Sequence, residues 1–169
     1  MFWVALSLLF PADRNATRHA WFGRTAALLA LVAITIVSGG FVAGLKAGKI
    51  YNTFPTMGGG WIPPNLMALD PAWRNLFDNP ITAQFDHRLL ALTTFVLIVV
   101  YWFRSRRAQL PERARRAGNA LLHTAILQVA LGIATLLLAV PVLLGVAHQA
   151  VAMLLFTVTL FLVHALRRT

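Results

Sequence analysis

Two histidines in apolar stretches of the chain are followed by the same residues at the same spacing. An alanine lies four residues after each histidine, and a phenylalanine lies eight residues after it. The matched pairs, each 61 residues apart, are His87 and His148, Ala91 and Ala152, and Phe95 and Phe156. Residues four apart share one face of a helix. The repeat therefore predicts two helices that each present an imidazole, a small residue one turn deeper and an aromatic ring two turns deeper.

The two imidazoles are expected at nearly the same depth. On ideal helices, His87 lies about 25 Å from Arg104, and His148 lies about 28 Å from Arg167. Two imidazoles that face each other across a helical bundle can hold one metal between them. The alanines leave room for a flat macrocycle and the phenylalanines close the pocket, so we predict a six-coordinate porphyrin iron with the two histidines as axial ligands. The alternative is that each histidine only hydrogen-bonds within the bundle.

Basic side chains near the predicted site suit the propionates of a porphyrin. Arg88 follows His87, and Lys46 and Lys49 lie just beyond the first apolar block. Carboxylates form strong, charge-assisted hydrogen bonds with such cations. The alternative for these residues is ordinary snorkelling toward the membrane surface.

Composition requires that the predicted helices lie in a membrane. Of the 169 residues, 59% are hydrophobic and 12% are charged, which is about half the charge of a soluble domain. About 20 apolar residues cross a bilayer core, and in lipid they must be helical. Four blocks are long enough: Trp21–Leu45, Phe85–Phe103, Ala117–Val140 and Val142–Leu166. We therefore predict an all-α integral membrane protein that forms a four-transmembrane-helix bundle.

The charge distribution predicts how the bundle is oriented. A net charge of +10 would suggest nucleic acid binding in a soluble protein, but here the basic residues gather at the ends of apolar blocks, so we expect the lipid bilayer and no nucleic acid as a partner. The clusters lie on one side of a four-helix chain and contain Arg14, Arg18, Arg24, Arg104, Arg106, Arg107, Arg113, Arg115, Arg116, Arg167 and Arg168. The positive-inside rule then predicts both termini in the cytoplasm or the mitochondrial matrix. The absence of cysteine excludes disulfides and thiolate metal ligands.

The chain is expected to divide into three segments. Residues 1–19 are predicted to be the end of a preceding membrane helix and a cytoplasmic linker. Residues 20–166 form the four-helix heme-binding domain, and residues 167–169 form a cytoplasmic tail. Within the domain, residues 46–79 form a long outer loop rich in glycine and proline, which is either an ordered connector or a functional lid.

Capping residues predict where two of the helices start. Asn79 is a good N-cap and Pro80 suits the first helical position, and the same reasoning starts the last helix at Pro141. In the outer loop, Ala68–Phe77 is predicted to form a short surface helix. The tryptophans of the loop, Trp61 and Trp73, suit the headgroup level.

Each of the other small and polar residues in or next to the spans has two possible roles. Gly40, Gly44 and Gly48 form a stripe that permits close helix packing, with contact to a porphyrin edge as the alternative. Gln128 and Gly132 share a face of the third helix. We expect generic packing for Gln128, with a hydrogen bond across the bundle as the alternative.

The remaining histidines lack the repeat. His19 is expected to be solvated. His123 and His164 lie toward the cytoplasmic side, and the alternative to a structural role is a second heme between them.

Four stretches of the chain resemble the heme A synthase family. They are Gly39–Gly48 with Tyr51–Gly58 (GGFVAGLKAG and YNTFPTMG), Phe77–Arg88 (FDNPITAQFDHR), Leu127–Thr135 (LQVALGIAT) and Ala147–Ala150 (AHQA). The resemblance is to the C-terminal half of that family's eight-helix, pseudo-symmetric fold. It implies that His87 and His148 ligate a resident heme b, with Arg88, Ala91, Phe95, Ala152 and Phe156 around it.

The resemblance also implies what this chain lacks. The family's first half carries a Glu-x-x-His-Arg motif that serves the substrate, whereas Gln84 precedes His87 by three residues here and Asp86 is not at that position. We therefore expect no catalytic residue in this chain, and expect the missing N-terminal half to take the substrate heme O. The implied role is electron transfer that supports oxidation of the heme O methyl group to the formyl group of heme A, for cytochrome oxidase biogenesis.

The same resemblance implies a location and several alternatives. The membrane would be the bacterial inner membrane or the mitochondrial inner membrane. Copies of this chain are also expected to form a homo-oligomer. The alternatives to an enzyme half are a stand-alone b-type cytochrome and a heme-free structural subunit.

Overall fold

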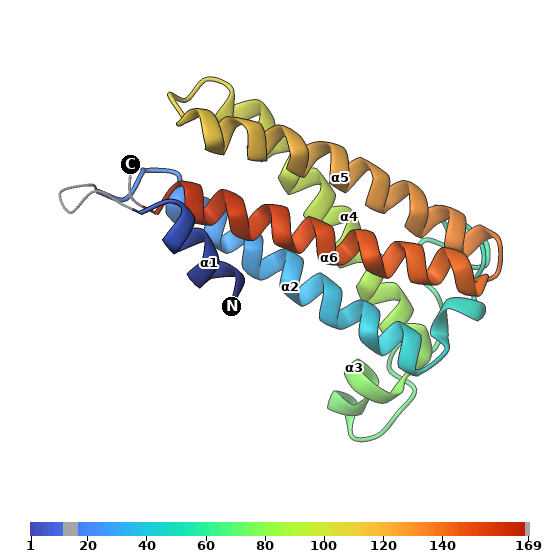
Figure 1. Ribbon diagram of the computed structural model, residues 1–169. Helices are drawn as coiled ribbons and strands as arrows, with labels where there is room; N and C mark the ends of the chain where they lie inside the picture. The colour runs from blue at the N-terminus through green and yellow to red at the C-terminus, as the bar shows by residue number, and fades with distance from the viewer. Residues whose placement is uncertain (12–16, 168–169) are drawn as a thin grey trace.

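The computed structural model describes residues 1–11 and 17–167, which fold into helices joined by loops (Figure 1). Arg14 and Arg168, and with them parts of the predicted segments 1–19 and 167–169, lie outside the described residues. The helices in chain order are α1 (Phe2–Leu9), α2 (Phe22–Gly44), η1 (Ala47–Lys49), η2 (Ala72–Arg74), α3 (Asn75–Asp78), α4 (Pro80–Ser105), α5 (Glu112–Leu137) and α6 (Val142–Ala165).

Four of these helices are long and apolar enough to cross a membrane, namely α2, α4, α5 and α6. They run side by side in Figure 1. The prediction of an all-α integral membrane bundle with four spans is therefore confirmed.

The four long helices form a closed ring of neighbours. α2 packs on α4, α4 on α5, α5 on α6, and α6 back on α2. Within the described part of the chain, α4 and α6 are thus one diagonal pair, and α2 and α5 are the other. The two helices that carry His87 and His148 lie diagonally opposite, while each of them has its own hairpin partner as a neighbour.

The two ends of the bundle differ in character. One end, which we call the basic end, carries Arg24, Arg104, Arg107, Arg113 and Arg167, and α6 ends there with α1 beside it (Figure 1). The opposite end carries residues 46–79 with α3, and we call it the loop end. The predicted gathering of basic residues on one side of the bundle agrees with this layout.

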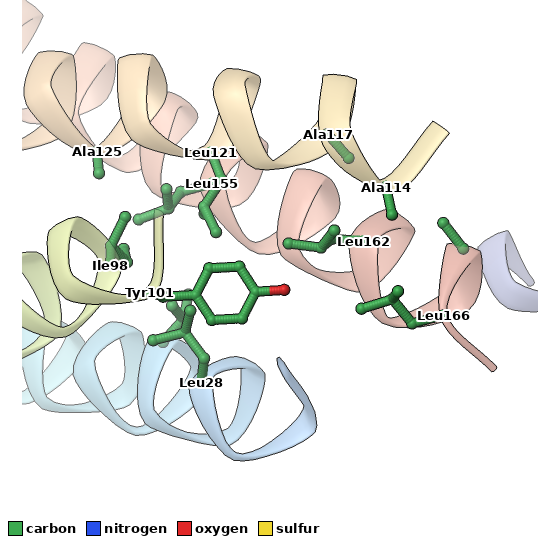
Figure 2. Packing of buried hydrophobic residues seen from close by; sticks show 12 residues of the cluster. Leu28, Ile98, Tyr101, Ala114, Ala117, Leu121, Ala125, Leu155, Leu162 and Leu166 are labelled. Carbon is green, nitrogen blue, oxygen red and sulfur yellow. The ribbon is translucent and has the colours of Figure 1, made fainter. Parts of the chain in front are cut away.

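A hydrophobic core joins the four long helices in the half near the basic end (Figure 2). Leu28, Ile98, Leu121 and Leu162 come from α2, α4, α5 and α6 in turn, and each is almost fully buried. Tyr101 lies among them, and its hydroxyl is 2.8 Å from Thr25 Oγ1, so its polar atom is satisfied. The histidines lie further along the helices, between this core and the loop end.

Buried positions repeat between the two hairpins. Leu28 and Val32 of α2 correspond to Leu121 and Ala125 of α5 at a constant offset of 93 residues, and all four are buried. Buried positions of α4 and α6 repeat at the offset of 61 found for the histidines, as Ile98 and Thr159 illustrate. The packing is therefore that expected of a duplicated helical hairpin.

The start of α4 was predicted correctly, whereas the other starts shift. Asn79 caps α4, since its side-chain oxygen accepts hydrogen bonds from the backbone N–H of Ile81 (3.0 Å) and Thr82 (3.4 Å). The last helix starts one residue later than predicted, because Pro141 has extended backbone and serves as its N-cap residue.

The limits of α5 also differ from the apolar block Ala117–Val140. α5 begins at Glu112, which pairs with Arg115 and with Arg116 (Nε to Oε1, 2.7 Å) one turn later, so a polar first turn precedes the apolar block. It ends at Leu137, because Ala139 and Val140 have φ of 58° and 63°, which a helix cannot contain.

The outer loop contains less helix than predicted. Only Ala72–Arg74 and Asn75–Asp78 are helical within the predicted Ala68–Phe77 segment. Phe77 packs edge-on against Phe41 of α2, with ring centroids 5.5 Å apart. This contact places the short helices beside the loop end of α2.

Candidate functional site

His87 lies on α4 and is held by two neighbouring residues of α2. Its Nδ1 is 2.9 Å from Ser38 Oγ. Its ring edge faces Gly39, where a Cβ atom would lie only 3.0 Å from Cε1. The histidine therefore fills the space that the missing side chain of Gly39 leaves.

The hydrogen bonds of Ser38 favour one tautomer of His87. The Ser38 hydroxyl has one proton, which it donates to the Thr35 carbonyl at 2.7 Å. In this arrangement its oxygen accepts from His87, so Nδ1 carries the ring proton. The lone pair of His87 is left on Nε2, which forms no hydrogen bond with the described residues. A metal-bound imidazole is held in this way, with its other N–H given to a neighbour.

His148 on α6 is held by α5 through a glycine and a polar residue as well, but its hydrogen bond is at Nε2 instead of Nδ1. A Cβ atom at Gly132 would lie 2.9 Å from His148 Cε1. Gln128 reaches the ring, with its Nε2 3.3 Å from His148 Nε2, so the hydrogen bond across the bundle that was the alternative for Gln128 is the arrangement found. His148 Nδ1 is buried and has no hydrogen-bond partner within residues 1–11 and 17–167.

The surroundings of both histidines fit an iron-ligating pair. Each ring makes one hydrogen bond to its hairpin partner and keeps a second nitrogen that no described residue satisfies. The free nitrogen of His148, Nδ1, is buried, and a buried polar atom without a partner is costly and calls for an explanation. Glycine at both contact positions makes the space that the two rings occupy. The donor set therefore suits a bis-imidazole heme.

The alanines and phenylalanines of the repeat take equivalent places. Phe95 and Phe156 are partly buried and both pack against the hydrophobic core. Ala91 and Ala152, one turn closer to the histidines, are partly buried as well. The two phenyl rings therefore lie between the hydrophobic core and the part of the bundle that contains His87 and His148.

Arg88 holds the outer loop. Its guanidinium donates to the carbonyls of Tyr51 (2.6 Å), Thr53 (2.9 Å) and Thr56 (3.3 Å), while its Nε is buried without a partner among the described residues. Gln84, which is 2% exposed, donates to the same Tyr51 carbonyl at 3.0 Å. Gln84 therefore ties the loop to α4. Lys46 and Lys49 are exposed at the loop end.

The glycine stripe of the first span was assigned to the wrong residues. A Cβ at Gly40 or Gly44 would meet no described atom within 4 Å, so the packing expected there is absent from the described structure. Gly48 does permit a close approach, because a Cβ there would lie only 3.0 Å from Val140 Cγ2. Gly39, which points to the histidine, and Ser38 were missed, although a polar serine beside a Gly-Gly pair in an apolar block was a usable signal.

The other histidines have separate environments. His123 is exposed, and its Nδ1 lies 2.8 Å from the Asn119 carbonyl of its own helix. His164 is 2% exposed and lies under α1, with Trp3 edge-on at 5.0 Å and Ser7 Oγ 3.4 Å from its Nε2. His19 is partly exposed, and its ring accepts from the Trp21 N–H at 3.2 Å, while its backbone N–H bonds to the Leu166 carbonyl.

Comparison with known proteins identifies the family. The family model described as COX15-CtaA, cytochrome oxidase assembly protein, matches residues 1–160. A heme A synthase of Nitrosospira multiformis is 50% identical, over 99% of this chain and 48% of that protein. Heme A synthase COX15 of Mus musculus is 46% identical (98% and 41%), and that of Arabidopsis thaliana is 44% identical (99% and 38%).

This chain spans less than half the length of those relatives. No solved structure matches it. The match to the family model nevertheless covers nearly all of the chain, including both histidines and the residues that hold them. The chain therefore belongs to the COX15-CtaA family of cytochrome oxidase assembly proteins.

Proposed function

We propose that this chain is the heme-b-binding half of a heme A synthase, with His87 and His148 as the two axial ligands. The observation that carries the proposal is the matched support of the two rings, each backed by a glycine and hydrogen-bonded by a polar residue of its hairpin partner. The name heme A synthase, which several relatives of this chain carry, supports the same assignment.

The neighbouring residues have distinct tasks in this proposal. Phe95 and Phe156 separate the ligands from the core and keep water away from the iron site. Ala91 and Ala152 leave room for the macrocycle. Arg88 offers its unpartnered Nε to a propionate while its terminal nitrogens keep the loop in place, and Lys46 and Lys49 supply further positive charge at the loop end.

Heme b held by two imidazoles supplies one-electron transfer. With both axial positions filled, this site offers no open coordination position for oxygen chemistry. Gln84 cannot take the proton-transfer role that a carboxylate would have, because its amide does not titrate. We therefore assign oxidation of the heme O methyl group to the N-terminal half that full-length relatives have, and electron transfer to the half described here.

The proposed orientation puts the basic end in the cytoplasm or the mitochondrial matrix. Arginines gather at that end, and the loop end carries Asp70 and Asp78 beside its few cations. Heme b would then lie nearer the opposite membrane surface, in the bacterial or the mitochondrial inner membrane.

Spectroscopy of ligand variants tests the proposal. The chain is produced in membranes of a heme-replete host and purified in detergent. His87→Ala and His148→Ala are each expected to abolish the low-spin heme spectrum, whereas the matched control His123→Ala keeps the wild-type heme content. An unchanged spectrum in either ligand variant rejects the axial pair, and heme loss in His123→Ala favours a site near the basic end.

A second measurement separates an enzyme half from a stand-alone b-type cytochrome. The chain is co-produced with the N-terminal half of a full-length relative in a host that makes heme O. Heme A formed only when both halves are present supports the enzyme half. A stable heme b spectrum without any heme A favours the cytochrome.

A further inference from the structure

Gly39 and Gly132 make the same contact on the two sides of the bundle. A Cβ at Gly39 would lie 3.0, 3.5 and 3.6 Å from Cε1, Nδ1 and Nε2 of His87. At Gly132 the corresponding distances to His148 are 2.9, 3.5 and 3.6 Å. The two sets agree within 0.1 Å although they join different helices, α2 with α4 and α5 with α6.

The contact involves the part of the imidazole that matters for ligation. Cε1 is bonded to both ring nitrogens, so any displacement of this edge moves both of them. Real Cβ atoms essentially never lie under 3.0 Å from another heavy atom, and contacts of 3.0–3.4 Å already require the neighbour to give way. A methyl group at either glycine must therefore push or rotate the ring, whichever nitrogen binds a metal.

We propose that Gly39 and Gly132 are positioning residues that set the place and plane of the two axial imidazoles. This inference rests on the proposed function. It assigns the geometry of the ligands to α2 and α5, the helices that do not carry them. The alternative use of these glycines, close helix packing alone, does not require that both contact the same edge of a histidine.

Other helical glycines of the chain provide matched controls. Gly40 follows Gly39 on α2, and Gly118 lies on α5 with Gly132. A Cβ at either would meet no described atom within 4 Å. Alanine at Gly40 or Gly118 should favour the helix without touching a histidine.

The experiment compares Gly39→Ala and Gly132→Ala with Gly40→Ala and Gly118→Ala. Heme content, the electron paramagnetic resonance g values of the ferric heme, and the midpoint potential are measured on the purified chain, together with thermal unfolding of heme-free protein. We expect Gly39→Ala and Gly132→Ala to retain heme about tenfold less well, as loss of ligand support typically does, and to shift the highest g value. The controls should match the wild type in heme properties and unfold at the same or a higher temperature.

The outcomes separate this inference from the proposed function. If Gly39→Ala and Gly132→Ala match the controls in heme content, g values and potential, the positioning role is overturned, while the ligand assignment stands on the histidine variants. The unfolding temperature of the heme-free protein and the heme content of the purified chain are compared across the variants. If the two fall in proportion, the glycines act by stabilising the fold, and the inference is overturned as well. If one variant does not fold, the other tests the same contact on the opposite hairpin. A wild-type chain without low-spin heme overturns both proposals.

Discussion

Ser38→Ala removes the hydrogen-bond acceptor that favours the Nδ1–H tautomer of His87. In the wild type, His87 Nδ1–H donates to Ser38 Oγ at 2.9 Å, because the serine proton is already given to the Thr35 carbonyl. Alanine keeps the helix and removes only the oxygen. The change therefore acts on the ring through a single contact, without altering a ligand.

The size of the effect follows from that contact. Leaving a polar group of the protein interior unsatisfied costs about 1–3 kcal/mol, and His87 is only partly buried, so the lower end applies. Loss of support behind a metal-bound histidine typically weakens metal binding about 10–100-fold. A donated N–H makes the imidazole a stronger base, which favours ferric iron. A loss of about tenfold confined to the ferric state raises the midpoint potential by about 59 mV.

The assay is a redox titration of the purified chain followed in the heme absorption bands. Ser38→Ala should keep a low-spin spectrum, because both histidines remain, while its potential rises by an amount of that order. Ser38→Thr keeps the hydroxyl and should restore the wild-type potential. Thr157→Ala is the matched control, since that hydroxyl donates to the Met153 carbonyl of its own helix. A potential unchanged in Ser38→Ala, or raised equally in Thr157→Ala, would refute the tautomer argument.

Two further predictions concern the elements that support the site. Arg88→Gln removes the hydrogen bonds to three loop carbonyls, so residues 51–56 should exchange amide hydrogen faster by an amount equivalent to about 1–3 kcal/mol. Arg74→Gln is its control, because the exposed ion pair of Arg74 with Asp78 is worth only about 0–1 kcal/mol. Equal amide protection of residues 51–56 in the two variants would contradict the role of Arg88 in holding the loop. Asn79→Ala removes the cap of α4 and the hydrogen bonds of its buried amide to the Asn65 carbonyl and Asn75, which should destabilise the chain by about 1–2 kcal/mol or more. Thermal unfolding in detergent measures this change, and an unshifted transition would show that the cap is not needed.

The fold was predictable to the extent that it depends on local properties. The four spans follow from apolar length, and the start of α4 follows from Asn79 and Pro80. The predicted starts of α5 and α6 differ from the observed ones. An apolar block does not include the polar first turn around Glu112, and it does not reveal that Pro141 has extended backbone. The short surface helix was overestimated because Leu69 bonds through both its N–H and its carbonyl to the Asn75 side chain, so the backbone there is not helical.

The two histidines proposed as ligands were predictable from the sequence, whereas the residues that support them were not. His87 and His148 were identified by a repeat that lies entirely in the sequence. The role of Arg88 at the loop was not, because its partners are backbone carbonyls 32 to 37 residues away. Gln84 was noted only as a missing carboxylate, whereas it shares the Tyr51 carbonyl with Arg88.

The sequence by itself determined the membrane class, the number of spans, the family resemblance and the pairing of two histidines with an alanine and a phenylalanine. Each of these depends on composition or on spacing within one helix. Only the tertiary structure decided that Gly39 and Ser38, and not Gly40, face His87. Adjacent residues of a helix point about 100° apart, so which of two neighbouring glycines meets a partner is fixed by how α2 is rotated against α4. That rotation is set by packing between helices, which no single segment of the sequence contains.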